Sequence, residues 1–405
     1  MSPFFTLKNL SSEIQTLRSD KRSRVLLSVA LGWFLVLGMR LVIPVILPGV
    51  IEEYDLSLTA AGGALTLLWI AYSIVQFPAG IFTDNFGERK ILTMSIFIGT
   101  IGVFLFSLSI NFNFFLFACI IFGLGSGLFG TPRVTALSKL YPENDGTVLG
   151  FTFSAGNFGS AVLPFIAGIF ATYLGWRFGF IFCIPIFIIT ILLLWKSPFK
   201  PPSSSTWGRS DFYKNIRLFI RGLSKKDVLL VSNATLLSVF TFQGFTSFFP
   251  LFLITMKSTS VTMATTLFSV FFIVGSISQP ISGILSDKYG ERRILLYLAA
   301  LHTICLFALP FVHGLIPLIF LSILLGTRAG LAPVNNAYLA SSIPPKVQGS
   351  GLGFLRSIFI GIGAFASFIV GFLADNYSFD IAFIFLGFLF FIATICYLFL
   401  PPSRE

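Results

Sequence analysis

Charged residues are scarce in this chain. They make up 11% of its 405 residues, whereas a typical soluble domain carries about 25%. Cysteine and histidine are scarce too: the four cysteines lie inside apolar stretches without the paired spacing of a zinc site, and only His302 and His313 could join them. The sequence therefore argues against a soluble protein, and it predicts no metal site, no cofactor and no catalytic residue.

Apolar sequence is abundant, with 55% hydrophobic residues and a mean hydropathy of +0.91. A membrane-spanning helix needs about 20 apolar residues. Stretches of this kind recur in two sets of six: 25–50, 58–83, 91–110, 114–139, 147–173 and 178–195, then 228–254, 262–286, 294–313, 315–341, 349–373 and 381–400. Several are apolar on every face, which excludes the alternating strands of a membrane barrel. The sequence predicts an all-α integral membrane protein with twelve transmembrane helices in two pseudo-symmetric six-helix bundles.

A hydrophilic segment separates the two sets of spans. Residues 196–227 are rich in proline, serine and basic residues, and Phe212, Ile216, Phe219 and Ile220 repeat there at helical spacing. We expect a linker with a short amphipathic helix, which either lies on the lipid surface or packs beneath the bundles. The predicted division is a tail at 1–24, a bundle at 25–195, the linker at 196–227, a second bundle at 228–400 and a tail at 401–405.

Basic residues fall mostly on one side of the predicted spans. Of the 27 Lys and Arg, 21 lie in the tails, the linker and the loops of that side, two lie on the other side and four lie within spans. Because Lys and Arg favour cytoplasmic loops, we expect both termini and the linker in the cytoplasm and the protein in the plasma (inner) membrane. The net charge of +11 follows from this topology, so it requires no nucleic-acid partner.

The two halves of the chain repeat at a constant offset of 203 residues. The segment GIFTDNFGERKIL, which starts at Gly80, aligns with GILSDKYGERRIL, which starts at Gly283. Without any gap, the same offset aligns Gln76 with Gln279, Gly127 with Gly330, Pro142 with Pro345 and Gly150 with Gly353. Two parallel copies of a six-helix unit suit alternating access to a central site.

The repeated loops carry the residues by which the chain resembles the major facilitator superfamily of transporters. The second copy matches the signature G-x-x-x-D-[RK]-x-G-x-[RK]-[RK] completely, and the first departs from it at Asn85. The matched residues are Gly80, Asp84, Gly87, Arg89, Lys90, Gly283, Asp287, Lys288, Gly290, Arg292 and Arg293. The resemblance covers essentially the whole chain. It implies the fold of that superfamily, a monomeric transporter rather than an enzyme, and loops that act as a conformational latch between the bundles.

The signature also has a reading in physical terms. Gly87 and Gly290 allow tight turns, and Gly80 and Gly283 allow a neighbouring helix to approach. The two aspartates end their helices beside basic residues, with which they can pair, or they can face the positive end of another helix. The alternative is a plain turn that follows the bias of Lys and Arg towards the cytoplasm.

All sixteen acidic residues lie in loops, tails or span ends, whereas four arginines lie within spans. An arginine inside the membrane costs roughly 2.5–3.5 kcal/mol, so we expect these side chains to face a wet cavity. Arg40 and Arg328 lie near mid-span. Arg133 and Arg356 lie nearer the cytoplasmic ends, where a long side chain reaches the interface. The superfamily resemblance implies that the first, fourth, seventh and tenth helices line the cavity, which puts Arg40 and Arg328 in opposite bundles facing one substrate.

Polar residues extend this set. The offset aligns Arg40 with Gln243 and Arg133 with Asn336. The predicted substrate-binding residues are Arg40, Arg328, Gln243, Arg133, Asn335, Asn336 and Asn157. Because a guanidinium group binds carboxylate or phosphate with two hydrogen bonds, the predicted partner is a small organic or inorganic anion, with or without a co-transported ion. The alternative is that Arg40 or Arg328 bonds backbone carbonyls or amides and only stabilises packing.

Three other functions compete with anion transport. The aromatic content of 16% fits a drug exporter, but this chain has no carboxylate at mid-membrane. An intramembrane enzyme would need a nucleophile and base or a metal cluster, which the sequence does not offer. A receptor on a transporter scaffold would be expected to carry a sizeable soluble domain. The leading interpretation is a secondary or facilitative transporter that works by alternating access.

Overall fold

The computed structural model describes residues 21–199, 226–342 and 348–401. Within these ranges twelve helices are long and apolar enough to cross a membrane, and no strand occurs. The predicted all-α fold with twelve spans is therefore confirmed. The spans are Arg22–Tyr54, Leu58–Gln76, Glu88–Ser107, Phe112–Leu140, Asp145–Leu174, Phe178–Lys196, Lys226–Lys257, Val261–Tyr289, Glu291–Phe311, Leu315–Ala340, Leu352–Asn376 and Phe379–Leu398. The amphipathic helix predicted in the linker lies outside the described residues.

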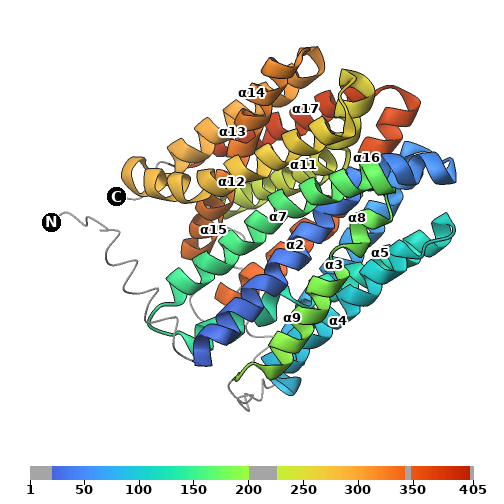
Figure 1. Cartoon of the computed structure of the whole chain (residues 1–405). Helices are drawn as coiled ribbons and strands as arrows, with labels where there is room; N and C mark the ends of the chain where they lie inside the picture. The colour runs from blue at the N-terminus through green and yellow to red at the C-terminus, as the bar shows by residue number, and fades with distance from the viewer. Residues whose placement is uncertain (1–20, 200–225, 343–347, 402–405) are drawn as a thin grey trace.

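The helices form two bundles that lie side by side (Figure 1). The first bundle contains α2 (Lys21–Tyr54), α3 (Leu58–Phe86), α4 (Glu88–Ser107), α5 (Phe112–Gly127), α6 (Gly130–Leu140), α7 (Asp145–Leu174), α8 (Phe178–Ile181) and α9 (Ile184–Lys196). The second contains α11 (Lys226–Lys257), α12 (Val261–Tyr289), α13 (Glu291–Ala308), η1 (Leu309–Phe311), α14 (Leu315–Gly326), η2 (Thr327–Gly330), α15 (Leu331–Ser342), α16 (Gln348–Asn376) and α17 (Phe379–Leu398).

Two turns show the repeat in three dimensions. Gly87 between α3 and α4 has φ 82°, and Gly290 between α12 and α13 has φ 89°. Their amides close the preceding helices by donating to Thr83 O at 2.8 Å and to Ser286 O at 2.9 Å. A positive φ is strained for other residues, which explains glycine at both positions. We call the end of the molecule with these two turns the signature end, and the end where α2 meets α3 the distal end.

Two spans are interrupted at equivalent depth. The fourth span breaks between α5 and α6, after Gly127, and the tenth passes from α14 through the 3₁₀ turn η2 into α15. The offset of 203 residues places Gly127 on Gly330, the last residue of η2. An interruption inside a long helix often marks a functional region. Here it places Arg133 in the first turn of α6 and Arg328 within η2.

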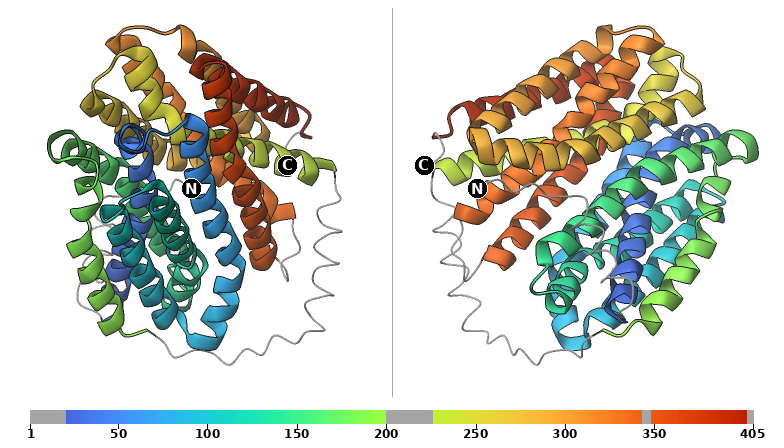
Figure 2. Two further views of the ribbon diagram at one scale, coloured as in Figure 1. Left: turned by 90° about the vertical axis from the view of Figure 1, so that its right-hand side faces the viewer. Right: turned by 60° about the vertical axis from the view of Figure 1, so that its left-hand side comes forward.

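The bundles touch along α3 against α16 and along α7 against α12 (Figure 2). The hydroxyl of Thr66 donates to Ala364 O at 2.8 Å, and the hydroxyl of Ser269 donates to Ala161 O at 2.8 Å. The offset of 203 residues places Thr66 on Ser269 and Ala161 on Ala364. The duplication therefore extends to the interface between the bundles.

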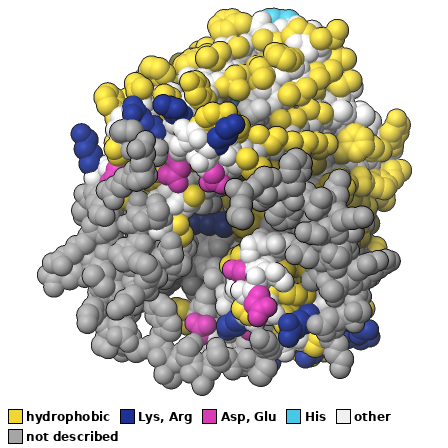
Figure 3. All heavy atoms as spheres, turned by 90° about the vertical axis from the view of Figure 1, so that its left-hand side faces the viewer, with side chains coloured by type: hydrophobic (Ala, Val, Ile, Leu, Met, Phe, Trp, Pro, Cys, Tyr) yellow, Lys and Arg dark blue, Asp and Glu magenta, His cyan; other side chains and the backbone are white. Residues whose placement is uncertain are grey.

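Glycines show how the two ends differ. At the distal end a Cβ atom on Gly62 would overlap the carbonyl group of Ser367, so the two backbones are in contact across the interface. At the signature end a Cβ atom on Gly283 or Gly353 would meet no described atom within 4 Å. Viewed from this end, the surface is hollowed between the two halves, and Lys or Arg side chains lie inside the hollow (Figure 3). Within the described part of the chain, the two bundles are thus in contact at the distal end and stand apart at the signature end.

A polar clamp holds the distal end of the first bundle. Arg177 Nη1 and Nη2 donate to the two carboxylate oxygens of Glu53 at 2.6 Å each, and Nη2 also donates to Ser109 O at 2.6 Å. This two-pronged pairing is the strong geometry for arginine and carboxylate. The offset places Asp380 at the position of Arg177. Asp380 interacts electrostatically with Lys257, one residue beyond the position that the offset gives to Glu53, so the second bundle has a related pair of opposite charges with the signs exchanged.

Candidate functional site

Arg40, on α2, lies in an aromatic enclosure. Its guanidinium carbon is 4.3 Å from the ring centre of Tyr72, 5.2 Å from that of Trp69 and 5.8 Å from that of Trp33. Only 4% of the residue is exposed. Nε donates to Val36 O at 3.3 Å, whereas Nη2 has no hydrogen-bond partner among the described residues. The rings stabilise the cation by cation–π attraction, but they do not neutralise its charge.

Arg133, on α6, lies beside the same tryptophan. Its guanidinium carbon is 4.1 Å from the ring centre of Trp33 and 4.5 Å from that of Phe153, and the residue is 0% exposed. Nη1 donates to the hydroxyl of Thr152 at 3.0 Å. Nε and Nη2 have no hydrogen-bond partner within the described part of the chain. Trp33 therefore links Arg133 to Arg40.

A third arginine comes from the other bundle. Arg356, on α16, is exposed and interacts electrostatically with Arg40, Arg133 and Tyr72. The packing of α16 on α3 explains this proximity: a Cβ atom on Gly361 would lie 3.2 Å from the hydroxyl oxygen of Ser73, the residue after Tyr72. We call Arg40, Arg133 and Arg356 the arginine cluster. The described groups that interact electrostatically with Arg40 and Arg133 include no carboxylate.

Arg328 has different partners. Its Nη2 donates to the carbonyl and hydroxyl oxygens of Ser238 at 2.5 and 3.0 Å, and its guanidinium carbon is 4.5 Å from the ring centre of Phe242. All these groups belong to the second bundle. None of the interactions recorded between described residues joins Arg328 to Arg40. In this conformation Arg40 is grouped with Arg133 and Arg356, and the expectation that Arg40 and Arg328 face one substrate stays a prediction.

Two of the predicted amides lie at helix contacts near the interface. Gln243 is buried, and its Nε2 donates to Ile360 O of α16 at 3.5 Å while its Oε1 has no partner among the described residues. Asn157 Nδ2 donates across the interface to Gln279 Oε1 at 3.5 Å. Gln243 thus lies at a contact between two helices of the second bundle, whereas Asn157 of the first bundle reaches α12 of the second.

The other two amides lie apart from the arginine cluster. Asn335 is buried in the second bundle, where its Nδ2 donates to Tyr397 Oη at 2.8 Å and its Oδ1 accepts from the same hydroxyl at 3.1 Å. This reciprocal pair joins α15 to α17. Asn336, the next residue, is exposed. Asn335 therefore joins two helices of the second bundle in this state, and Asn336 lies on an exposed face of its helix.

The signature loops have few contacts in this conformation. Asp84 and Asp287 are exposed, and no hydrogen bond or ion pair of either side chain occurs among the described residues. A Cβ atom on Gly80 would meet Thr131 of α6 at 3.8 Å, an ordinary van der Waals contact, and one on Gly283 would meet no described atom within 4 Å. The close approach of a helix of the opposite bundle to these glycines stays a prediction.

The basic residues of these loops bind within their own bundle. Arg89 lies over the ring of Trp195 at 5.0 Å, and Arg292 donates to Leu398 O at 2.8 Å. Lys288 lies 5.1 Å from the ring centre of Tyr289. Gly87 and Gly290 form the turns described above, and Lys90 and Arg293 are exposed.

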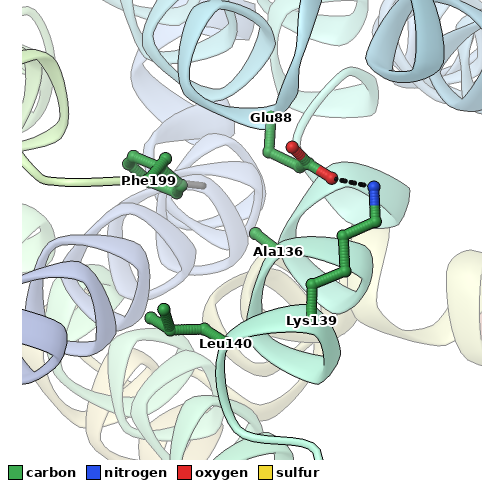
Figure 4. A pocket seen from close by; sticks show the side chains of 5 residues that line it. All are labelled: Glu88, Ala136, Lys139, Leu140 and Phe199. Carbon is green, nitrogen blue, oxygen red and sulfur yellow. Dashed lines mark hydrogen bonds and ion pairs between the residues drawn. The ribbon is translucent and has the colours of Figure 1, made fainter. Parts of the chain in front are cut away.

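Glu88 is a residue that the sequence did not single out. It is 3% exposed, and its carboxylate lies 2.7 Å from Lys139 Nζ at a small pocket completed by Ala136, Leu140 and Phe199 (Figure 4). No pattern in the sequence links residues this far apart. The aromatic residues around Arg40 could have been found, since Trp33 precedes Arg40 by two helical turns and so lies on the same face of α2.

Twelve spans in two bundles, with buried arginines that have no carboxylate partner among the described residues, are the features expected of a membrane transporter. The family model of the Major Facilitator Superfamily matches this chain over residues 29–259 and 231–405. The chain belongs to this superfamily, and it is a multi-pass membrane transporter of small molecules rather than an enzyme.

Known relatives share the fold but differ in what they transport. The chain is 25% identical to the riboflavin transporter RibZ of Clostridioides difficile (strain 630), over 88% of this chain and 90% of RibZ. It is 35% identical to the multi-drug resistance efflux pump PmrA of Streptococcus pneumoniae serotype 4, over 34% and 36% of the two chains. A bacterial homolog of the human lysosomal transporter Spinster has a TM-score of 0.79 at 18% identity, over 94% and 96%. These relatives do not determine the substrate class.

Proposed function

We propose that this transporter moves a small anion by alternating access. The observation that carries the proposal is the arginine cluster, in which Arg40, Arg133 and Arg356 gather without a carboxylate among the described groups that act on them. A buried cation without a counter-charge is costly. An anionic substrate would supply the missing negative charge, and guanidinium groups are suited to carboxylate and phosphate.

We propose that the signature end faces the cytoplasm, with both termini and the 196–227 linker on that side of the plasma (inner) membrane. The excess of Lys and Arg on this side supports the orientation. The conformation is then inward-facing, which is also the state of the Spinster homolog. One chain contains both bundles and the whole cluster, which supports a monomer.

We propose that the signature loops act as a latch in the opposite state. A Cβ atom on Gly283 would meet no described atom within 4 Å, and Asp84 and Asp287 are exposed, so these loops would be able to face the other bundle when the hollow closes. Their charges would then lie near basic residues or near the positive end of a helix.

Counterflow in proteoliposomes tests the proposed function. Labelled small carboxylates and phosphates are compared with neutral and cationic compounds of similar size. We expect exchange of at least one anion and none of the cations. Transport that is indifferent to substrate charge would contradict the anion proposal and leave the superfamily membership unaffected.

A second candidate is export of amphipathic aromatic compounds. Four rings, those of Trp33, Trp69, Tyr72 and Phe153, surround Arg40 and Arg133, and the relatives include a drug efflux pump and a riboflavin transporter. The rings already cover the arginines, however, which leaves the N–H edges as the unused groups. In the same counterflow experiment, this candidate predicts exchange of neutral aromatic compounds.

A further inference from the structure

We propose that Arg356 of the second bundle completes, with Arg40 and Arg133 of the first, a site for a small anion that carries at least two negative charges, such as a dicarboxylate or a phosphate monoester. This inference rests on the proposed anion transport and names its substrate class. The argument starts from hydrogen-bond donors that the protein leaves unused.

Arg133 presents a complete binding edge. Its Nη1 is anchored on the hydroxyl of Thr152 at 3.0 Å, which orients the group, whereas Nε and Nη2 have no partner among the described residues. Nε and Nη2 lie on the same side of a guanidinium group and together form the fork that binds a carboxylate or phosphate with two parallel hydrogen bonds. The residue is 0% exposed, so this edge is a buried polar group that needs a partner.

Arg40 and Tyr72 provide further donors next to this edge. Arg40 and the Tyr72 hydroxyl interact with each other, and beyond this mutual contact neither Arg40 Nη2 nor the hydroxyl has a hydrogen-bond partner within the described ranges. The faces of Arg40 and Arg133 are covered by aromatic rings. The ligand therefore approaches the edges of the guanidinium groups, where N–H donors point, and it needs acceptor oxygens rather than a ring.

The charge of the cluster sets the charge of the ligand. Arg356 adds a third positive charge from the other bundle: it lies on α16, where a Cβ atom on Gly361 would be 3.2 Å from the Ser73 hydroxyl of α3, its side chain is exposed, and it interacts electrostatically with Arg40 and Arg133. Three like charges in a partly dehydrated space repel one another by several kcal/mol at an effective dielectric constant near 20. One negative charge leaves the cluster with a net charge of +2, whereas two or three negative charges lower it to +1 or to zero. A divalent anion is therefore preferred to a monovalent one of the same size.

Titration of the purified full-length protein in a neutral detergent tests the proposal. The probes are succinate and inorganic phosphate as divalent anions at pH 7.5, with butyrate as the monovalent match and chloride to hold the ionic strength constant. Binding is followed by tryptophan fluorescence, since Trp33 and Trp69 flank Arg40, and by thermal unfolding. We expect a saturable response to a divalent probe at a concentration at least about tenfold below that of butyrate.

The variant that isolates the inference is Arg356→Gln. We expect it to weaken binding of the divalent probe about tenfold or more, with little effect on butyrate, because it removes one charge-assisted contact. Lys226→Gln is the matched control: it removes the same charge from an exposed position at the start of α11 and is expected to bind as the wild type does. Unfolding temperatures without added anion check that both variants fold.

The failures of the two proposals are distinguishable. Equal responses to succinate and butyrate, or an unchanged divalent preference in Arg356→Gln, would overturn the two-bundle site and leave anion transport standing. No saturable response to any of these anions, together with counterflow of neutral compounds, would overturn both.

Discussion

Asp375 of α16 accepts hydrogen bonds from Thr59 of α3 across the interface between the bundles. Its carboxylate binds the Thr59 amide at 2.7 Å and hydroxyl at 2.5 Å, and also the Leu58 amide at 2.9 Å. These are the first amides of α3, where the helix dipole favours a negative charge. The offset places Thr172 at the position of Asp375, so this ionic contact at the distal end has no charged equivalent on the other side of the pseudo-symmetry axis.

Asp375→Asn is therefore expected to loosen the distal end. Because the carboxylate is exposed, we expect the distal-closed state to lose about 1 kcal/mol of stability. This loss shifts the population towards the distal-open state several-fold. The measurement is the labelling rate of Gly63→Cys by a bulky thiol reagent, in a background with the four native cysteines replaced. Gly63 lies at the interface, with Phe368 4.0 Å from its Cβ position. Glu52→Gln, an exposed charge at the same end, is the control; equal labelling in both variants would remove the gate role of Asp375.

Arg177→Gln is expected to lower the stability of the first bundle. The substitution breaks the pairing with Glu53 and the bond to Ser109 O, which together are worth about 1–2 kcal/mol at a partly exposed site. Thermal unfolding is the measurement. Because the two residues act as one unit, the double variant with Glu53→Gln should cost little more than either single one; additive losses would show that they do not.

Arg40→Gln is expected to reduce anion transport more than Arg40→Lys. Lysine keeps the charge but loses the fork, and a charge-assisted bond is worth roughly 1.5–3 kcal/mol net. Counterflow of the same labelled anion in both variants decides this. The sequence alone predicts the same effect on transport for Arg328→Gln as for Arg40→Gln. The hydrogen bonds of Arg328 to Ser238 lead us to expect instead that Arg328→Gln mainly lowers the stability of the protein. Equal activity of Arg40→Gln and wild type would exclude Arg40 from the site.

Asp84→Asn is expected to slow the interconversion of inward- and outward-facing states without changing substrate affinity in the favoured state. The reason is that Asp84 is exposed here and would gain its partner only when the signature end closes. The transport rate and the binding affinity, measured separately, test this expectation. Unchanged transport rates in both Asp84→Asn and Asp287→Asn would rule out a latch at these loops.

The orientation of the chain gives a further prediction. A cysteine placed at Ser204, in the linker, should be protected from an impermeant thiol reagent in intact cells and labelled after the membrane is opened. Labelling in intact cells would place the linker outside and reverse the proposed direction of the open hollow.

The membrane spans and the duplication could be predicted from the sequence. Insertion into a bilayer depends on the apolarity of about 20 consecutive residues, which is a local property, so the twelve spans follow from reading the chain in windows. The offset of 203 residues also carries over to three-dimensional contacts. Thr66 with Ala364 and Ser269 with Ala161 form the same bond in the two halves of the interface, because duplicated helices pack with duplicated geometry.

Which arginines meet was decided by the tertiary structure. The sequence gives the depth of a residue along its span, and by depth Arg40 matched Arg328. It does not give the orientation of each helix about its axis or the identity of the helix beside it, because close packing of small residues determines which helices associate in the membrane. The contact of α16 with α3 brings Arg356 to Arg40 and Arg133, while α11 holds Arg328 through Ser238. The ion pair of the buried Glu88 with Lys139 likewise depends on two helices meeting, which no local pattern in either segment records.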